Sequence, residues 1–352
     1  MPRALSQLLR QAGSSQVLIN RLLPVCGSIR SAQNELRWLD ERAQGVALNC
    51  SNRRSHGSLL EEFVTRRAQH EPLQYILGSE YFGELEIKCR PGVLIPRQET
   101  ASAVSHLASL LAGPGLLPPR LRIVDFCTGT GCIPLLLHHE LSSQVDNNRT
   151  ELELYGIDIS PSAIDLAQEN KRLQLDSRAR DVAPGHQSLE RMRFELADLF
   201  RDGDISSHSE MDVLISNPPY ISPADFETKT EKSVRDFEPT LALVPTKTDA
   251  RGVVTGDEFY PRLLHVAQQC GARIVLMEVG DGAQAERVCQ LAISQEVWDV
   301  IEVWKDEPSA SCGNEQESAS TPDARRIRVK GRGKARSVFA VRGEGRGWVG
   351  LA

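Results

Sequence analysis

From Leu121 onward, short apolar runs alternate with longer stretches whose apolar residues recur at helical spacing. A parallel strand that is buried on both faces reads as a continuous apolar run, and a crossover helix usually connects it to the next parallel strand. The alternation therefore favours an α/β domain. Seven runs have the length and composition of strands: residues 122–126, 152–157, 192–196, 213–216, 273–279, 297–303 and 337–341. We expect a seven-stranded, doubly wound sheet.

The chain before this sheet has a different pattern. In residues 1–79, leucine, phenylalanine and valine recur at helical spacing and no strand-like alternation is evident, which predicts a small N-terminal helical domain. Residues 80–100 then alternate apolar and polar side chains between glycines and a proline, which predicts a hairpin or linker. The sheet domain is expected to occupy residues 101–352.

A long polar tract over residues 305–336 separates the last two predicted strands. Its first half is acidic and rich in serine, whereas the segment RRIRVKGRGKARS carries seven basic residues and no acid. This composition is typical of a solvated, flexible insertion. The alternative is a basic patch that meets RNA or a ribosome-associated partner.

Charge and cysteine usage exclude several classes of protein. A net charge of −6 and a pI of about 5.8 argue against a chain whose whole surface binds nucleic acid, although a local basic patch is compatible with them. The eight cysteines include no C-x-x-C pair, so we expect neither a metal site nor a disulfide framework. Reduced, mostly buried cysteines suit a reducing compartment.

The N-terminal 34 residues bear on localisation. They contain Arg3, Arg10, Arg21 and Arg30 and no acidic residue, with leucine and valine between them. This composition is typical of an organelle presequence, and it equally suits the first helices of the folded chain. No apolar run approaches the roughly 18 residues that span a bilayer, so we expect no membrane association.

A glycine turn follows the first predicted strand. The sequence Thr128-Gly129-Thr130-Gly131 lies between that strand and an apolar, helix-compatible stretch. Strand, glycine turn and helix in this order form the ligand site of open α/β sheets, where glycines let the backbone approach a ligand closely. The turn therefore predicts a nucleotide-type cofactor.

Acidic residues end the next two strands. Asp158 closes the second strand and can accept hydrogen bonds from two ribose hydroxyls, although it can also cap the helix that follows. Asp198, after the third strand, can accept from an adenine amino group, with Leu199 against the ring face. The pattern describes an adenosine site, and these residues alone leave NAD possible.

The fourth strand leads into Asn217-Pro218-Pro219-Tyr220 beside the expected cofactor. A nitrogen conjugated with a carbonyl or an aromatic ring is a poor nucleophile, so it must be held in line by groups that accept its N–H bonds. The Asn217 side-chain carbonyl and the Pro218 backbone carbonyl can supply two acceptors, the prolines stiffen the turn, and the Tyr220 ring can cover a planar group. These residues predict methyl transfer from S-adenosylmethionine to a planar amide or amine nitrogen.

With these motifs, the chain resembles the HemK-type glutamine methyltransferases that modify peptide-chain release factors, most closely their mitochondrial branch. The likeness extends to HEPLQYILG at residues 70–78, PGVLIPRQET at 91–100, FEPTLAL at 237–243 and MEVG at 277–280, and covers roughly residues 30–305 and the last strand.

The resemblance implies a fold, a cofactor and a substrate. It implies that the helical domain helps to bind a release factor and that Asn217 to Tyr220 hold the glutamine of its Gly-Gly-Gln loop. Cofactor contacts carry over to Thr128, Gly129, Thr130, Gly131, Asp158, Leu199 and Asn217. A mitochondrial matrix location follows from the same branch, with the cytoplasm as the alternative.

Three departures from the family pattern are Cys127 in place of the first glycine of the turn, Gln98 in place of a proline, and Ala101 where an acid is common.

Three alternatives stay open. A nucleic-acid adenine methyltransferase shares the Asn-Pro-Pro-Tyr motif but needs a basic, aromatic-bearing region, whereas aromatic residues here are 5% of the chain. The others are a methyltransferase for a ribosomal-protein glutamine and a catalytically silent α/β binding module.

Overall fold

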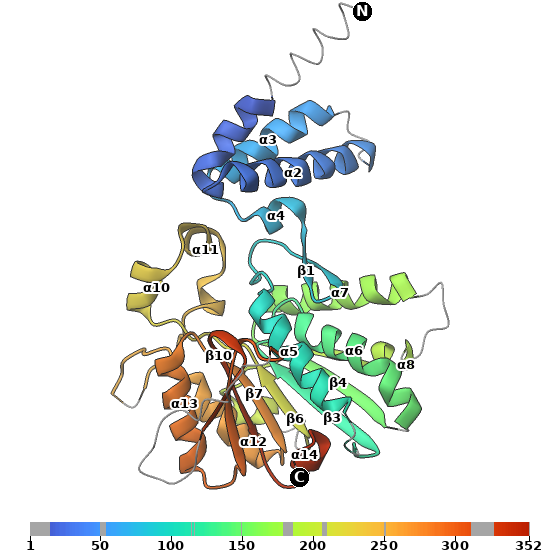
Figure 1. Ribbon diagram of the computed structural model, residues 1–352, viewed down its shortest axis with the longest axis vertical. Helices are drawn as coiled ribbons and strands as arrows, with labels where there is room; N and C mark the ends of the chain where they lie inside the picture. The colour runs from blue at the N-terminus through green and yellow to red at the C-terminus, as the bar shows by residue number, and fades with distance from the viewer. Residues whose placement is uncertain are drawn as a thin grey trace, which may run out of the picture. The chain divides into compact units, whose positions relative to one another are not determined.

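The computed structural model describes residues 15–49, 54–113, 115, 117–148, 150–178, 186–205, 210–249, 251–310 and 327–351 (Figure 1). The chain divides into two compact units. The smaller unit consists of Met1–Glu80, Cys89–Pro91 and Thr230–Glu238, and the larger of Tyr81–Lys88, Gly92–Lys229 and Pro239–Ala352.

The smaller unit is helical, as predicted for this part of the chain. Residues 15–26 form a helix. They are followed by α2 (Ile29–Asn49), α3 (His56–Ala68), α4 (Leu73–Leu77) and, much later in the chain, α11 (Lys232–Phe237). Its core includes Leu22, Leu39 and Leu59, each at most 1% exposed. The presequence-like segment is therefore part of the folded unit from residue 15 onward, while residues 1–14 lie outside the described residues.

The larger unit contains an eight-stranded sheet. Its strands are β3 (Arg120–Phe126), β4 (Glu151–Asp158), β5 (Arg193–Leu196), β6 (Val213–Ser216), β7 (Ile274–Glu278), β8 (Val300–Glu307), β9 (Arg328–Lys330) and β10 (Arg332–Val341). Their spatial order is β5-β4-β3-β6-β7-β10-β8-β9. The pairs from β5 to β7 are parallel, and β10 is antiparallel to both β7 and β8. The seven predicted strands are all present, so the seven-stranded fold is confirmed, with β9 as an addition.

Helices cover both faces of the sheet (Figure 1). One face packs on α5 (Gln98–Leu111), α6 (Cys132–Asn148), α7 (Pro161–Arg178) and α8 (His186–Arg191), and the other on α12 (Phe259–Gln269) and α13 (Gly282–Ser294). Side chains alternate across the central strand, with Ile123 in the first core and Val124 in the second. Burial on both faces explains why the strands read as continuous apolar runs.

Short elements complete the chain. The two-stranded sheet of β1 (Ser79–Phe82) and β2 (Leu85–Lys88) begins one residue before the hairpin or linker predicted at residues 80–100, and α5 already begins at Gln98. The others are α9 (Asp202–Ile205), α10 (Pro223–Lys229), the 3-10 helix η2 (Thr240–Ala242) and α14 (Gly345–Trp348). None of the described helices combines the length and apolar character that crossing a bilayer requires.

Both ends of the polar tract at residues 305–336 differ from the expected flexible insertion, because they continue the sheet as the end of β8, as β9 and as the start of β10. Basic side chains of the tract pair with acidic residues on β8. Lys330 lies 3.0 Å from the fully buried carboxylate of Glu302, and Arg336 lies 2.8 Å from Asp306. Charge pairing and strand hydrogen bonds thus order these residues, while residues 311–326 lie outside the described part of the chain.

Candidate active site

The glycine turn joins β3 to α6 in a conformation that its residues explain. Cys127, Gly129 and Gly131 have φ angles of 62°, 55° and 76°, in the left-handed region. A Cβ atom on Gly131 would lie 2.8 Å from the Phe194 ring, so only glycine fits there. Cys127, where the resemblance noted in the sequence implies a glycine, adopts the glycine-type conformation, which costs an L-residue about 1–2 kcal/mol. The departure thus leaves the left-handed turn intact.

Asp158, at the end of β4, braces this turn. Its Oδ2 accepts a 2.9 Å hydrogen bond from the Gly129 N–H, and its Oδ1 accepts one of 2.9 Å from the Ser160 N–H, just before α7. Burial raises the pKa of the Asp158 carboxyl, and the hydrogen bonds from the backbone amides of Gly129, Ser160 and Ile159 partly oppose that rise. A carboxylate offers about four lone-pair sites on its two oxygens, so acceptor capacity remains. Asp158 therefore supports the start of the helix and can still accept hydrogen bonds from a ligand.

Asp198 and Leu199 follow β5 in a turn that backbone contacts hold in place. The Asp198 carboxylate accepts a 2.9 Å hydrogen bond from the Phe200 N–H, and the Leu199 carbonyl accepts one of 2.7 Å from Arg262 Nε. Leu199 is 5% exposed. This turn therefore places the Asp198 carboxylate, a hydrogen-bond acceptor, next to the apolar side chain of Leu199.

These elements surround one pocket of the larger unit, at the carboxyl ends of β3 and β6, where the strand order reverses. It encloses about 1130 Å³, including the space at its mouth. Eight of the predicted residues line it: Thr128, Gly129, Thr130, Asp158, Asp198, Leu199, Asn217 and Pro219. Gly131, Pro218 and Tyr220 lie outside the lining. The pocket thus joins the predicted cofactor residues to the start of the Asn-Pro-Pro-Tyr turn.

The polar groups of this pocket fit S-adenosylmethionine. Two carboxylates, Asp158 and Asp198, can accept from ribose hydroxyls and an adenine amino group. The hydroxyls of Thr128 and Thr130 are buried without a well-aligned hydrogen bond among the described residues. Burial raises the pKa of Asp125 and of Cys132, and the nearby hydroxyls of Thr128 and Thr130, respectively, partly oppose these rises. Buried polar groups without good partners are available to a ligand.

The Asn-Pro-Pro-Tyr turn directly follows β6 and is tied to its surroundings through both end residues. Asn217 donates a 3.3 Å hydrogen bond from Nδ2 to Thr100 Oγ1, on the first turn of α5. Tyr220 donates a 3.0 Å hydrogen bond from its phenol to Glu278 Oε1, at the end of β7. Burial, followed by the negative charge of Glu278, raises the pKa of Tyr220 well above its ordinary value. The phenol is therefore neutral and acts as a donor.

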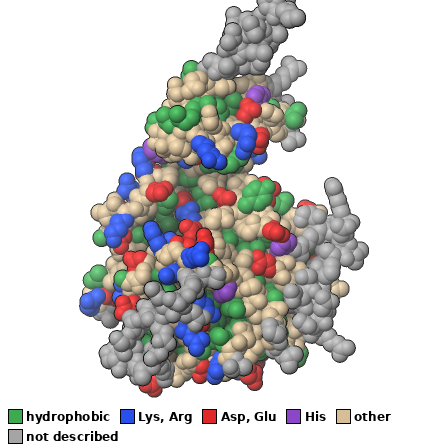
Figure 2. All heavy atoms as spheres, in the orientation of Figure 1, with side chains coloured by type: hydrophobic (Ala, Val, Ile, Leu, Met, Phe, Trp, Pro, Cys, Tyr) green, Lys and Arg blue, Asp and Glu red, His purple; other side chains and the backbone are tan. Residues whose placement is uncertain are grey.

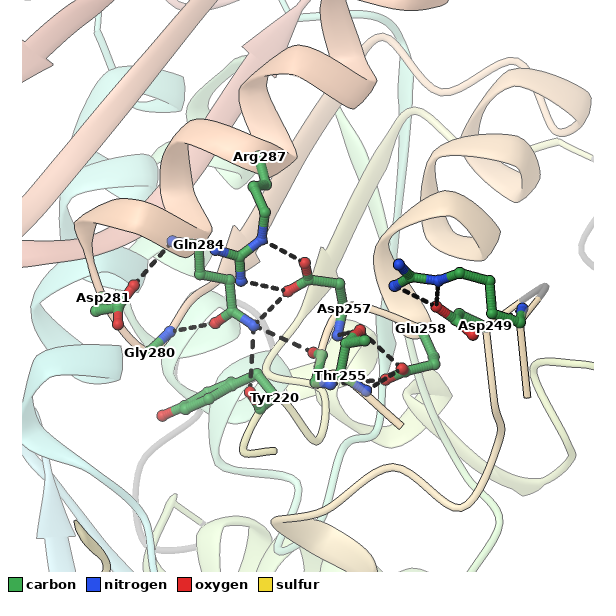
Figure 3. Close-up of polar contacts among 11 residues, drawn as sticks. Tyr220, Asp249, Thr255, Asp257, Glu258, Gly280, Asp281, Gln284 and Arg287 are labelled. Atoms are coloured by element: carbon green, nitrogen blue, oxygen red, sulfur yellow. Dashed lines mark hydrogen bonds and ion pairs between the residues drawn. The ribbon is translucent and has the colours of Figure 1, made fainter. Parts of the chain in front are cut away.

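Gln284, on α13, holds the turn from another side (Figure 3). Its side-chain oxygen accepts a 2.7 Å hydrogen bond from the Gly280 N–H. Its nitrogen lies 3.2 Å from the Tyr220 carbonyl, 3.1 Å from the Gly256 carbonyl and 2.8 Å from Asp257 Oδ1. One buried amide thus links three loops, those that carry Tyr220, Gly256 and Gly280.

The loop that carries Asp257 has further anchors (Figure 3). Arg287 Nε lies 2.5 Å from Asp257 Oδ2. Glu258 accepts hydrogen bonds from the Gly256 N–H at 2.9 Å and from the Thr255 hydroxyl at 2.8 Å. The carboxylates fold this loop back on itself, which places the Gly256 carbonyl within reach of the Gln284 amide.

Sequence reasoning missed the roles of Thr100, Glu278 and Gln284. Thr100 and Glu278 lie in segments that resemble the family, but nothing in those segments says which side chains they contact. A buried acid at the end of a strand was the available signal. Among the described residues, no group of three or more His, Cys, Asp or Glu side chains gathers in a way that could hold a metal ion.

Comparisons with known proteins give the family. Residues 100–254 match the N-6 DNA methylase family. The mitochondrial MRF1 N(5)-glutamine methyltransferase MTQ1 of Saccharomyces cerevisiae is 34% identical over 263 residues, covering 69% of this chain and 68% of the relative. The release factor glutamine methyltransferase of Thermodesulfovibrio yellowstonii is 31% identical over 252 residues, 70% of this chain and 76% of the relative. The N-terminal domain of human METTL16 aligns with a TM-score of 0.44 at 17% identity, covering 80% of this chain and 82% of that one.

The chain is therefore an enzyme of the S-adenosylmethionine-dependent methyltransferase class. Within that class, it belongs to the family of release factor glutamine methyltransferases, which confirms the resemblance noted in its sequence.

Proposed function

We propose that this enzyme transfers a methyl group from S-adenosylmethionine to the side-chain nitrogen of the glutamine in the Gly-Gly-Gln loop of a mitochondrial peptide chain release factor. The observation that carries the proposal is the Asn217 side chain on the pocket wall, in a chain 34% identical to a mitochondrial MRF1 N(5)-glutamine methyltransferase.

Four residues would handle the substrate. Asn217 Oδ1 and the Pro218 carbonyl would accept the two N–H bonds of the glutamine amide and so favour charge moving onto its nitrogen. Pro218 and Pro219 restrict the backbone of the turn, and Tyr220, held by Glu278, would stiffen its far end. These contacts would hold the glutamine nitrogen in line with the methyl group. Such positioning matters because a nitrogen with a delocalised lone pair is a poor nucleophile.

The pocket residues would hold the cofactor. Bound S-adenosylmethionine would supply an electrophilic methyl group on a sulfonium sulfur. Asp158 would accept from the ribose hydroxyls and Asp198 from the adenine amino group, with Leu199 against the ring. The turn Thr128 to Gly131 would let the backbone approach closely, because its two glycines carry no Cβ.

The helical residues 1–79 would form the substrate-recognition domain, residues 80–100 the linker and residues 101–352 the catalytic domain. In support, α2 exposes the large apolar side chains Ile29, Trp38 and Leu48, of which Leu48 is 86% exposed. Exposed apolar groups of this size suit a protein partner.

We also place the enzyme in the mitochondrial matrix, with the cytoplasm as the alternative. The yeast relative is named as mitochondrial, and the basic N-terminal residues have the composition of a presequence. The proposed partner is therefore a release factor of that compartment.

A second candidate is adenine N6 methylation of a nucleic acid, which the match of residues 100–254 to N-6 DNA methylases favours. The charge of the chain argues against it. The net charge is −6, and basic side chains are interspersed with acidic ones on the face drawn in Figure 2. A ribosomal-protein glutamine is the other alternative, and it would use the same amide chemistry.

The test is incubation of the purified chain with labelled S-adenosylmethionine and a mitochondrial release factor. A Gln→Ala variant of the Gly-Gly-Gln loop, a ribosomal protein and DNA serve as controls. We expect label on the wild-type factor alone. Label on DNA or on the ribosomal protein would favour the corresponding alternative, and label on none of them would contradict the proposal.

A further inference from the structure

A chain of hydrogen bonds leads away from the pocket wall, where Asn217 and Thr100 lie, to Glu278, and joins three side chains that are far apart in the sequence. Asn217 Nδ2 donates to Thr100 Oγ1 at 3.3 Å, and the Thr100 hydroxyl donates to Glu278 Oε2. Thr100 and Glu278 are 6% and 5% exposed, so little water competes for these groups. The sheet brings the ends together, because Ser216 pairs with Met277 and the next residues are Asn217 and Glu278.

The direction of these hydrogen bonds matters for the proposed reaction. An amide side chain has an acceptor oxygen on one side and a donor nitrogen on the other, and the two are nearly equal in size. Only the Asn217 oxygen can accept from the N–H groups of a glutamine amide. If the Asn217 side-chain amide were flipped, its NH₂ group would face the NH₂ group of the substrate, and two hydrogen-bond donors would oppose each other.

The Glu278 carboxylate decides the direction. A carboxylate is an acceptor only, whereas a hydroxyl has one proton to donate. When the Thr100 hydroxyl donates its proton to Glu278, the Thr100 oxygen can only accept a hydrogen bond from Asn217. Asn217 must therefore direct its NH₂ group toward Thr100. Among the described residues, Asn217 makes this one side-chain hydrogen bond, which leaves Oδ1 free for the pocket.

The other Glu278 oxygen is occupied as well. Oε1 accepts the 3.0 Å hydrogen bond from the Tyr220 phenol. Burial raises the pKa of Glu278 above its ordinary value, and the hydrogen bonds from Thr100 and Tyr220 and the positive charge of Arg336 partly oppose that rise. A carboxylate satisfies two hydroxyl donors at once, whereas a protonated carboxyl would have to turn its own proton toward one of them.

We propose that Glu278, acting through Thr100, orients the Asn217 amide so that its oxygen faces the substrate. Glu278 and Thr100 are then positioning residues, which act on the substrate only through Asn217. This inference rests on the proposed function for its catalytic meaning, but the orientation itself is a property of the enzyme without substrate.

Three single variants separate this role from simple packing. Thr100→Ser keeps the hydroxyl, Thr100→Val keeps the shape and removes it, and Glu278→Gln keeps the shape but introduces a donor beside Thr100. We expect Thr100→Ser to keep kcat within about threefold of the wild type and Thr100→Val to lower it by about tenfold or more, with the cofactor Kd and Tm little changed. In the double variant, the loss in kcat should be smaller than the product of the two single losses, because the effect of Glu278→Gln on Asn217 passes through the Thr100 hydroxyl.

A second measurement does not depend on turnover. The side-chain NH₂ signals of Asn217, identified by their absence in Asn217→Asp, should exchange slowly with solvent in the wild type and in Thr100→Ser. They should exchange faster in Thr100→Val. Equal exchange in the wild type and Thr100→Val, or equal kcat in Thr100→Ser and Thr100→Val, would overturn the inference. A wild type that does not methylate the release factor would contradict the proposed function instead, and the exchange measurement would still decide the orientation.

Discussion

The phenol of Tyr220 donates a 3.0 Å hydrogen bond to the carboxylate of Glu278, at the end of the neighbouring strand β7. Together with the Gln284 contact to the Tyr220 carbonyl and the Asn217 contact to Thr100, it fixes the Asn-Pro-Pro-Tyr turn at three points. A turn held in this way is ordered before substrate arrives, which lowers the cost of positioning a nitrogen.

Asn217→Ala should abolish methyl transfer while leaving the fold intact. The substitution removes the acceptor for the substrate N–H, and the loss of one such preorganised group typically lowers kcat by about 100-fold or more. Turnover of the release factor and the thermal unfolding midpoint should be measured on the same preparation. A folded variant with near-normal turnover would contradict the role of Asn217.

Replacing Asp158 with alanine should weaken binding of S-adenosylmethionine by about 1–3 kcal/mol, because the variant loses acceptors for the ribose hydroxyls. Isothermal calorimetry measures this directly. Asp158→Asn, which keeps one oxygen, should fall between the wild type and the alanine variant. If all three bind equally well, Asp158 does not contact the cofactor.

Gln284→Ala should destabilise the larger unit by about 1–3 kcal/mol, because it leaves the Gly280 N–H and the Tyr220 and Gly256 carbonyls without their partner. Gln290→Ala is the matched control, since Gln290 is an exposed residue on the same helix. Chemical denaturation compares the two variants. Equal unfolding free energies would mean that the Gln284 contacts contribute little.

Asp125→Asn should change the pH dependence of stability. Burial raises the pKa of the Asp125 carboxyl well above its ordinary value of about 3.9, so the folded state binds a proton more tightly than the unfolded state. Such a group favours folding below the ordinary pKa, and its contribution is lost as pH rises toward the folded-state pKa. The variant should therefore match the wild type near pH 4 and become relatively more stable as pH increases.

Denaturation of both proteins at a series of pH values measures this difference. Asp165→Asn, on the exposed side of α7, is the control and should track the wild type. If the difference in unfolding free energy between Asp125→Asn and the wild type is the same at every pH, burial does not raise the pKa of Asp125.

The sheet could be predicted from the sequence because strands buried on both faces leave a continuous apolar signal. β9 carries no such signal, since its sequence is Arg-Val-Lys, and its Lys330 pairs with Glu302 on the neighbouring strand β8. Composition alone therefore predicted a flexible loop for this segment, although it forms a strand at the edge of the sheet. Charge pairing across strands is not visible until the register is known.

The candidate site likewise contains residues that could be predicted from the sequence and residues that could not. The cofactor and catalytic residues could be proposed because each of them lies at or just after the end of a predicted strand. Thr100 and Gln284 contact the Asn-Pro-Pro-Tyr turn from α5 and α13, far along the chain in either direction. Only the packing of α5 and α13 in the folded chain brings these side chains to the turn.

The position of β10 has a consequence for synthesis of the protein. Of the strands in the described residues, this one comes last along the sequence, yet it pairs with β7 on one side and β8 on the other. While the nascent chain is still emerging from the ribosome, β7 and β8 expose open edges that invite aggregation. A premature stop codon anywhere before Arg332 would leave those edges permanently open, so even a late truncation should yield an insoluble product and not a slightly shorter enzyme.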